Sequence, residues 1–255
     1  MKTLVVANQK GGVGKTTLLV HMAHYAAEAG NRVLVIDLDP QCNTTSSLEA
    51  FASAIVASAL FGHQSIDLQQ KSEHRITLIG ADSALLHVDR APLDATQAFV
   101  EQVRHLSDST QFDLCLIDTA PALGLRLVAA VSAANYVISP IELEAYSTDG
   151  IASMLKTIYG IRQTLNPSLQ FLGMLPSRVN AHSPAQKANL VDLLKSYSDL
   201  VVRRVITQRT STGEAASMKK PVWAIRKTSA RDAGQEMKAV LAHIIDKMGG
   251  LPYDA

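Results

Sequence analysis

The sequence predicts a doubly wound α/β fold, in which helices cover both faces of a mostly parallel β-sheet. Three observations carry this prediction. Short runs rich in Val, Ile and Leu alternate with longer helical patterns along the whole chain of 255 residues. Several of these runs are apolar at almost every position, as expected for strands that are buried on both faces. A glycine-rich loop, GGVGKTT, connects the first strand to the first helix.

The expected elements follow one another in a regular order. The strands are the runs TLVVAN, RVLVID, RITLIG, DLCLID, NYVISPI, QFLGML and VVRRVI, at residues 3–8, 32–37, 75–80, 113–118, 135–141, 170–175 and 201–206. Helical patterns lie near residues 15–29, 48–60, 95–107, 123–133, 149–165, 184–197 and 229–248. Repeated strand–helix units of this kind build a parallel sheet with crossover helices. No linker, low-complexity segment or repeat interrupts the order, so residues 1–255 are interpreted as one domain.

The composition excludes several classes of protein. Apolar residues make up 47% of the chain and charged residues 18%, which is typical of a globular protein and not of a disordered one. A net charge of +1 gives no global attraction to nucleic acid, so any basic surface must be local. Two cysteines and the lack of an apolar run of roughly 18 residues favour a cytosolic chain without a membrane span. The first residues enter a strand directly, so no signal peptide is expected.

The glycine-rich loop has the context of a nucleotide-binding P-loop, because it follows a strand and opens a helix. Glycines let backbone N–H groups turn around phosphate oxygens, and the helix N-terminus adds partial positive charge. Lys15 is placed to reach the β- and γ-phosphates, and the hydroxyl of Thr16 to ligate Mg²⁺. The expected nucleotide-binding residues of the loop are Gly11, Gly12, Val13, Gly14, Lys15, Thr16 and Thr17.

Three acidic residues stand at the ends of buried strands. Asp118 ends the run DLCLID, where a carboxylate at the carboxyl end of a central strand faces the ligand crevice and can hold Mg²⁺. Asp37 and Asp39 end another strand and face the same side, because strand residues two apart do so. We expect Asp37 to contribute to the metal shell and Asp39 to orient the attacking water. The simpler alternative, that either residue only caps its loop, stays open.

A second lysine, Lys10, precedes the glycines and would by itself be interpreted as a solvated surface residue. However, KGGVGKTT, VLVIDLDPQCNTT, FDLCLIDTAP and KKPVWAI together resemble the ParA/MinD family of deviant Walker ATPases, and the small ParA partition proteins in particular. The resemblance implies ATP and Mg²⁺ as cofactors and ATP hydrolysis as the activity. It also implies that Lys10 reaches the ATP of a second subunit in a sandwich homodimer, that Asp39 positions water, and that Asp118 binds magnesium.

Further assignments follow from the same resemblance. Residues 39–45 are similar to switch I and residues 118–124 to switch II, with Cys42 standing where many relatives have glycine. The segments GMLPSRVN (173–180) and KKPVW (219–223) occupy the positions that bind the base in the family. Asn180 and Pro221 are therefore the expected contacts of the adenine.

The nearly neutral chain contains one strongly basic segment. Between residues 203 and 238 it carries nine Lys and Arg residues against Glu214, Asp232 and Glu236, a net charge of +6. Such a surface suits DNA backbone binding without base readout, as the C-terminal region of ParA relatives provides, although a merely solvated face is the alternative. Gln208 and Ser211 stand where the resemblance would place arginine. The candidate DNA contacts are Arg203, Arg204, Arg209, Lys219, Lys220, Arg226, Lys227 and Arg231.

The favoured function is therefore a nucleoid-associated cytoplasmic ATPase that positions a plasmid, a chromosome or another cargo with a ParB-like or other adaptor protein. Because the chain begins at the P-loop strand, an N-terminal DNA-reading domain is not expected. A MinD-like membrane-associated regulator is one alternative, but the terminal helix carries few cations beside its apolar stripe, so we expect it to be packed. A redox enzyme on the same scaffold is another, for which Cys42 and Cys115 are poorly placed.

Overall fold

The protein is described by a computed structural model that covers residues 1–68, 74–143 and 148–253. In this part of the chain the strands form one seven-stranded sheet with the order β3-β4-β2-β5-β1-β6-β7, and every pair of neighbours is parallel. The strands are β1 (Lys2–Val6), β2 (Val33–Asp37), β3 (Ala52–Val56), β4 (Ile76–Gly80), β5 (Leu114–Asp118), β6 (Tyr136–Glu142) and β7 (Gln170–Ser177). The predicted doubly wound α/β fold is confirmed.

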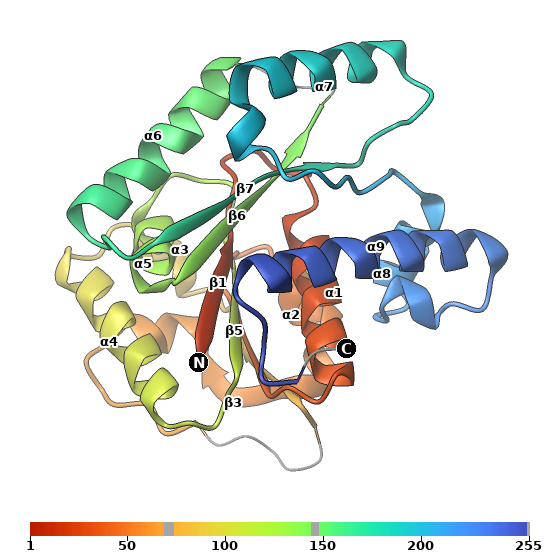
Figure 1. Ribbon diagram of the computed structural model, residues 1–255. Helices are drawn as coiled ribbons and strands as arrows, with labels where there is room; N and C mark the ends of the chain where they lie inside the picture. Colours follow the sequence, from red (N-terminus) through yellow and green to blue (C-terminus); the bar gives the residue numbers. More distant parts are fainter. Residues whose placement is uncertain (69–73, 144–147, 254–255) are drawn as a thin grey trace.

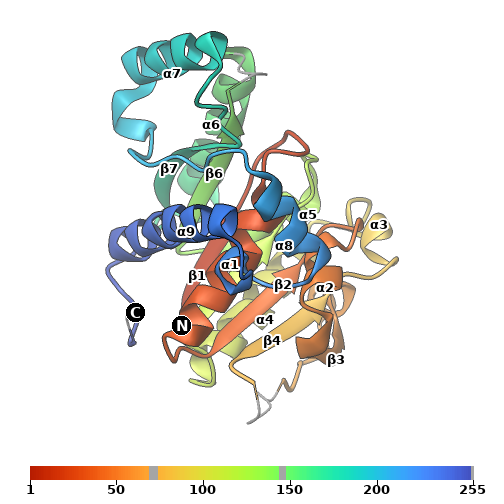
Figure 2. The ribbon, with the colours of Figure 1, turned by 90° about the vertical axis from the view of Figure 1, so that its right-hand side faces the viewer.

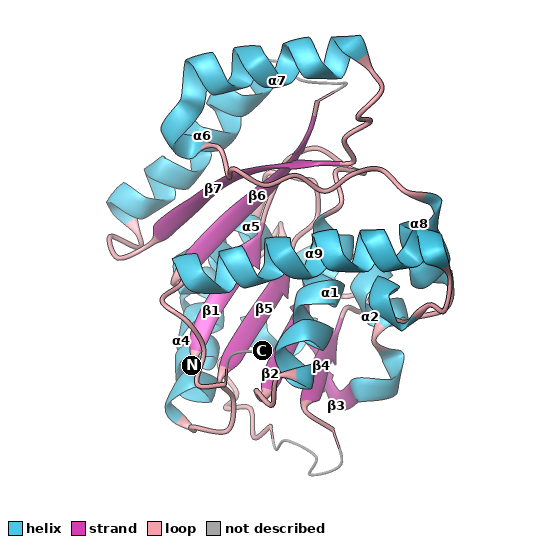
Figure 3. Cartoon of the chain, turned by 45° about the vertical axis from the view of Figure 1, so that its right-hand side comes forward, coloured by secondary structure: helices cyan, strands magenta, loops and turns pink. Residues whose placement is uncertain are grey.

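Helices cover both faces of the sheet, as Figures 1 and 3 show: α1 and α9 lie on one face, and α4, α5 and α6 on the other. The α-helices of the described residues are α1 (Lys15–Glu28), α2 (Asn43–Ser47), α3 (Leu85–Val88), α4 (Asp94–Asp108), α5 (Leu125–Ala133), α6 (Thr148–Thr164), α7 (Pro184–Tyr197), α8 (Thr210–Ser217) and α9 (Thr228–Lys247). Short 3-10 turns occur at Glu49–Phe51, Ala57–Phe61, Ser198–Leu200 and Val222–Ala224. None of these helices is both long and apolar enough to cross a membrane.

Alternation of side chains explains why the central strands are apolar at nearly every position. Leu4 and Val6 of β1 belong to the core beneath α1 and α9, whereas Val5 between them belongs to the core beneath α4, α5 and α6. Each central strand therefore buries both of its faces, which is the pattern of a parallel sheet with helices on each side.

Two expectations from the sequence are wrong. Residues 48–60 do not form a helix: β3 runs through them between two 3-10 turns and pairs with β4 at the edge of the sheet. Exposure alternates along β3, so the strand hides only one face, and this weak pattern is easily mistaken for a helical one. Residues 201–206 do not form a strand either. They run alongside β7 and contact it at separate points. The N–H of Val202 donates to the carbonyl oxygen of Met174 at 2.8 Å, and an isolated β-bridge joins Val201 to Met174.

The pairing of the central strands determines where the functional side chains meet. In the parallel register, Asp118 at the end of β5 lies beside Val6 of β1 and beside Asp37 of β2. The P-loop follows β1 directly, and α1 begins at Lys15. The loop and both aspartates therefore share the carboxyl edge of the sheet, which is where α/β proteins bind their ligands. Figure 2 shows α8 and α2 near the start of α1, whereas α7 lies beyond β7.

Candidate active site

The backbone of the P-loop adopts conformations that only glycine accepts without strain. Gly12 has φ 78° and Gly14 has φ 93°, both in the left-handed region. A Cβ on Gly14 would also lie 2.8 Å from the hydroxyl oxygen of Ser177 at the end of β7. These glycines bring the loop close to β7 and turn it into the N-terminus of α1, where the free N–H groups favour an anion.

Lys15 is buried over the loop that it follows. Its side chain is folded back so that Nζ donates a hydrogen bond to the carbonyl oxygen of Lys10 at 3.1 Å. Burial lowers the pKa of Lys15, while the nearby charges of Asp118 and Asp39 raise it. The ammonium group is thus held at the mouth of the glycine turn, beside two carboxylates that favour its charged form.

Asp118 is almost completely buried and accepts two short hydrogen bonds. The hydroxyl groups of Thr16 and Thr44 both donate to its Oδ2 at 2.7 Å, one from the P-loop helix and one from the segment after β2. Burial and the charge of Asp37 raise the pKa of Asp118 to about 7, against the opposing effect of the threonine hydroxyls and Lys15. Thr16 and Asp118, predicted from different motifs, are therefore in direct contact.

Asp37 organises the loop that follows β2. Its carboxylate accepts hydrogen bonds from the N–H of Asp39 at 3.0 Å, and from the N–H and the hydroxyl of Thr45 at 2.8 and 2.7 Å. Burial raises the pKa of Asp37 in spite of these donors. These three donors connect the end of β2 to the loop that follows it.

Asp39 begins the loop and is nine-tenths buried. Its Oδ1 accepts a hydrogen bond from the N–H of Gln41 at 3.0 Å, and the N–H of Cys42 donates to its backbone carbonyl at 2.9 Å. Cys42 has φ 55°, a left-handed conformation that glycine adopts without strain. The tight turn leaves Asp39 close enough to Lys15 to influence its pKa.

Asp37, Asp39 and Asp118 form what we call the carboxylate cluster. All three are at least nine-tenths buried, and the charges of Asp118 and Asp39 raise the pKa of Lys15, a buried cation beside them. Excess buried negative charge with oxygen ligands is the environment that suits Mg²⁺. No group of three or more described His, Cys, Asp or Glu side chains is arranged to hold a metal ion. The hydroxyl of Thr16 and the carboxylate of Asp118, which are in contact, offer oxygen ligands that fit a magnesium ion bound together with phosphate oxygens.

Lys10 lies outside the turn and is engaged with its own subunit. Its Nζ is 3.2 Å from Glu142 Oε2 at the end of β6, and the lysine side chain is 42% exposed. Arg178 approaches the other oxygen of Glu142 at 3.6 Å and donates to the carbonyl oxygen of Gly12 at 2.8 Å. The sequence gives no signal for Glu142, which belongs to no recognised motif, and it places Arg178 in the expected base-binding segment 173–180 without a role of its own.

A cavity of about 260 Å³ opens beside the P-loop. It is lined by loop residues and by the segment around α8, including Gly12, Gly14, Thr17, Arg178, Thr207, Gln208, Arg209 and Thr212. Neither Asn180 nor Pro221 is among its lining residues. Asn180 is exposed, and Pro221 is buried next to Val222, whose N–H donates to His21.

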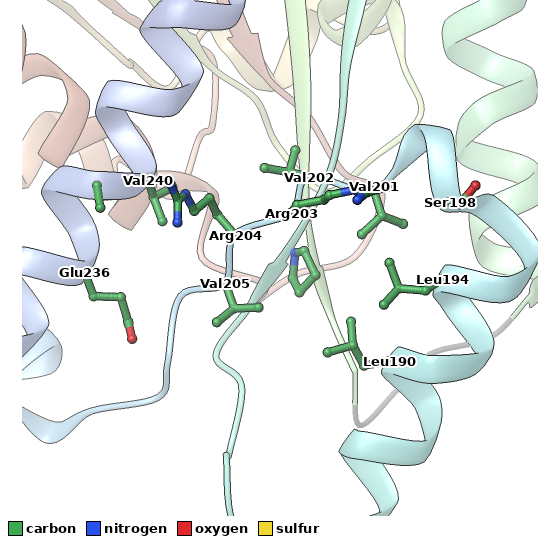
Figure 4. A pocket seen from close by; sticks show the side chains of 12 residues that line it. Leu190, Leu194, Ser198, Val201, Val202, Arg203, Arg204, Val205, Glu236 and Val240 are labelled. Atoms are coloured by element: carbon green, nitrogen blue, oxygen red, sulfur yellow. The ribbon is translucent and has the colours of Figure 1, made fainter.

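The eight candidate DNA contacts do not form one surface. Arg203 and Arg204 border an apolar groove of about 750 Å³ between α7 and α9, which Figure 4 shows with Leu190, Leu194 and Val240. Arg209 lines the cavity beside the P-loop and lies 3.7 Å from Glu236. Lys219 is paired with Glu49 at 2.7 Å, and Lys220, which follows it, is exposed.

The remaining three candidates share a groove of about 470 Å³ at the start of α9. Arg226, Lys227 and Arg231 line it together with Lys238 and Trp223, and we call it the basic groove. The Lys238 ammonium lies 5.0 Å from the centre of the Trp223 ring, whose N–H donates to Glu28. Lys227 also contacts Glu214 of α8. The net positive charge of the segment is thus concentrated most strongly here.

Comparison with known proteins identifies the family. Residues 1–171 match a family model described as an AAA domain. The chain is 44% identical to Protein IncC of Escherichia coli, over 97% of this chain and 70% of that protein. It is 32% identical to the chromosome-partitioning ATPase Soj of Thermus thermophilus, with 87% of each chain covered. The chain belongs to the ParA/MinD family of P-loop ATPases. Like other members of this family, it hydrolyses ATP with Mg²⁺ as cofactor.

A solved structure supports the nucleotide site of this family member. Cobyrinic acid a,c-diamide synthase of Mycobacterium smegmatis, with a bound ATP analogue and magnesium, matches with a TM-score of 0.75 and 28% identity over 100% of both chains.

The two cysteines of the chain are poorly placed to hold a metal cluster. Cys115 is fully buried within β5, which raises its pKa to about 12, and Cys42 lies in the loop after β2.

Burial of Asp118 leads to a prediction about stability and pH. Its pKa rises from 3.8 to about 7 on folding, so the folded protein binds this proton more tightly than the unfolded chain does. Its contribution to the free energy of unfolding is therefore largest below about pH 4 and is lost as the pH rises to about 7, by up to about 4 kcal/mol. Without Mg²⁺ and nucleotide, Asp118→Asn should become more stable relative to wild type as the pH rises, in urea titrations at several pH values.

Asp113 provides the matched control for this measurement, since it stands at the other end of β5. Hydrogen bonds from Arg32 lower the pKa of Asp113, so its stabilising effect is lost on acidification instead. The difference between wild type and Asp113→Asn should change with pH in the opposite direction. A stability difference for Asp118→Asn that stays constant from about pH 4 to 8 would contradict the account of a costly buried carboxylate.

Proposed function

We propose that this ATPase forms an ATP-dependent sandwich homodimer, binds DNA without sequence preference, and positions a plasmid, chromosome or other cargo with an adaptor protein. The observation that carries the proposal is the position of Lys10. It lies next to a P-loop whose own lysine, Lys15, is already buried at the glycine turn, and it projects from the loop where a second subunit can meet it. The partition function stated in the name of the Thermus thermophilus relative supports the cargo.

Each residue of the site has a proposed role in hydrolysis. The backbone of Gly11, Gly12, Val13 and Gly14, with Thr17 and Lys15, binds the phosphates. Thr16 and Asp118 hold Mg²⁺, which supplies charge neutralisation for the transferring phosphoryl group. Asp37 supports the metal shell by fixing the loop after β2, and Asp39 orients the attacking water. The contacts between Thr16, Thr44 and Asp118 support this division, since they place one oxygen cluster between the two loops.

Dimerisation follows from a change of partner for Lys10. In the isolated subunit its ammonium is bound to Glu142, and the half-exposed pair contributes little to stability. The triphosphate of a second subunit offers more negative charge than one carboxylate, so the lysine gains by moving across a two-fold interface. ATP would thereby bring two subunits together, and ADP, which lacks the γ-phosphate, would release them.

The base of the nucleotide is proposed to occupy the cavity beside the P-loop. Thr207, Gln208 and Thr212 border it with polar side chains, next to the glycine turn that would hold the phosphates. Asn180 and Pro221 do not line this space, so the proposal moves the base contacts from these two residues to the segment before α8.

DNA is proposed to bind mainly in the basic groove. Arg226, Lys227, Arg231 and Lys238 gather there around one wall formed by Trp223, which suits a phosphate backbone. A two-fold dimer would present two such grooves, so that the second contact becomes intramolecular and binding depends on ATP. Arg203, Arg204, Arg209, Lys219 and Lys220 lie elsewhere and would add weaker contacts. The proposal places the ATPase, as one domain over residues 1–255, on the nucleoid in the cytoplasm.

The packing of α9 favours DNA over a membrane surface as the partner. Its apolar stripe, formed by Met237, Val240, Leu241, Ile244 and Ile245, is buried against α1 and the sheet. A membrane-binding amphipathic helix must instead expose such a stripe. The expected packed terminal helix is confirmed, and a MinD-like membrane regulator has no comparable support from the described residues.

Substitution of the two lysines of the P-loop should affect ATP binding and dimerisation differently. Lys15→Ala should abolish ATP binding, because it removes charge-assisted contacts to the phosphates that contribute at least about 1.5–3 kcal/mol. Lys10→Ala should bind ATP with nearly wild-type affinity, yet remain a monomer and hydrolyse poorly. Calorimetry measures the affinity and light scattering with ATP the mass. Normal ATP affinity of Lys15→Ala would overturn the assignment of the site, and a normal dimer of Lys10→Ala would make Lys10 a surface cation.

DNA binding should depend on salt and on the basic groove. Each phosphate contact contributes about −0.9 to the slope of log affinity against log salt, so Arg226→Ala or Arg231→Ala should flatten the slope by about one unit. Arg162→Ala, an exposed arginine of α6 on the opposite face of the sheet, is the matched control and should leave the slope unchanged. Fluorescence anisotropy with random duplexes, ATP or ADP, and several salt concentrations provides the test. Operator-specific or salt-insensitive binding would contradict the mechanism, and so would binding that ADP supports equally well.

A further inference from the structure

Arg126 is a buried arginine that belongs to no recognised motif of the sequence. It lies in the first turn of α5, shortly after the segment 118–124, and its side chain is only 10% exposed. Its guanidinium donates to Asp89 Oδ2 from Nε at 3.1 Å and from Nη2 at 2.7 Å. The remaining terminal nitrogen, Nη1, donates to the backbone carbonyl of Leu38 at 3.0 Å, and this hydrogen bond is buried. One side chain therefore connects three separate segments of the chain.

The carbonyl that Arg126 binds belongs to the peptide that carries Asp39. The N–H of Leu38 donates to the backbone oxygen of Asp118 at 3.0 Å, which fixes the residue that supplies this carbonyl. On the other side, the N–H of Asp39 donates to the carboxylate of Asp37 at 3.0 Å. The peptide between Leu38 and Asp39 is thus held at its oxygen by Arg126 and at its nitrogen by Asp37. These two contacts fix the backbone orientation that directs the side chain of Asp39.

Asp89 in turn holds Arg126 in place. Its Oδ1 accepts a hydrogen bond from the backbone N–H of Arg126 at 3.2 Å, so the carboxylate binds both ends of this residue at the N-terminus of α5. Gly124, the residue at the N-cap, allows the approach: a Cβ there would lie 2.5 Å from Asp89 Oδ1. The contact therefore requires the absence of a side chain at position 124, within the segment that follows Asp118.

We propose that Arg126 is a positioning residue for ATP hydrolysis, which holds the Leu38–Asp39 peptide so that the Asp39 carboxylate stays in line with the attacking water. This inference rests on the proposed role of Asp39. A displacement of about 1 Å in a reacting group can cost about a hundredfold in rate, so one buried hydrogen bond to this peptide is sufficient to matter. Because Arg126 lies in the first turn of the helix after residues 118–124, it also transmits movement of that segment to residues 39–45.

Arg126→Lys is the most informative variant, because lysine retains the charge for Asp89 but lacks the fork that contacts Leu38 at the same time. We expect its kcat to fall about tenfold, and that of Arg126→Ala up to about a hundredfold. The dissociation constant for a non-hydrolysable ATP analogue with Mg²⁺ should stay within about twofold in both, since the phosphate contacts are intact. Arg32→Ala is the matched control. It removes another arginine–aspartate pair, between Arg32 and Asp113, at the amino ends of β2 and β5, and should leave kcat unchanged.

Asp39→Ala, measured in parallel, separates this inference from the proposed function. If Asp39→Ala hydrolyses ATP at the wild-type rate, the proposed role of Asp39 fails. If Asp39→Ala is impaired but Arg126→Lys and Arg126→Ala turn over normally, the inference about Arg126 alone is overturned. It is also overturned if the Arg126 variants lose ATP affinity in parallel with kcat, or if Arg32→Ala reduces kcat equally, because Arg126 then acts only on the stability of the fold.

Discussion

The accumulation of buried negative charge at one edge of the sheet is the constraint on which the rest of the site depends. Parallel pairing of β2 with β5 places Asp37 beside Asp118, and Asp39 follows two residues later. Burial makes each charge costly, so the loops around the cluster are built to donate hydrogen bonds, from Thr16, Thr44 and Thr45. These hydrogen bonds offset only part of the cost of the buried negative charge. The magnesium ion that accompanies a triphosphate would add the positive charge that the donors lack. Under the proposed roles of these residues, nucleotide and magnesium would therefore relieve the electrostatic cost of the buried carboxylates.

The same arrangement makes the site responsive to the state of the nucleotide. The donors to Asp118 come from two different segments, the P-loop helix and the loop after β2, so a change at the metal reaches both at once. Arg126 extends this connection to the segment after β5, and the pair of Lys10 with Glu142 extends it to the end of β6. Each contact is modest in energy. Under the proposed function, these contacts together would let one phosphate alter the surface that a second subunit and DNA contact.

Much of this site can be predicted from the sequence, because its parts lie in local motifs. The P-loop context and the apolar strand that ends in Asp118 predict that Thr16 and Asp118 share one magnesium ion, and the two side chains are in contact, while the ion itself stays a prediction. The predictions for the edge strand β3 and the irregular residues 201–206 are wrong, since local patterns at a sheet edge are weak and tertiary contacts decide. The contacts of Arg126 with Asp89 and of Lys10 with Glu142 join residues far apart in the chain. No local sequence pattern predicts these contacts. The same holds for the distribution of the basic residues over separate grooves.

The most direct test of the central claim is the protonation state of Asp118, followed by infrared spectroscopy. Since burial raises the pKa of Asp118 to about 7, nucleotide-free molecules should carry a protonated carboxyl on the acidic side of neutral pH, with a carbonyl band that Asp118→Asn lacks. Addition of Mg²⁺ with an ATP analogue should remove this band, because the metal requires the ionised carboxylate. A band of Asp118 that persists after Mg²⁺ and nucleotide bind, or that is absent without them even at about pH 5, where an ordinary aspartate is already ionised, would contradict the account.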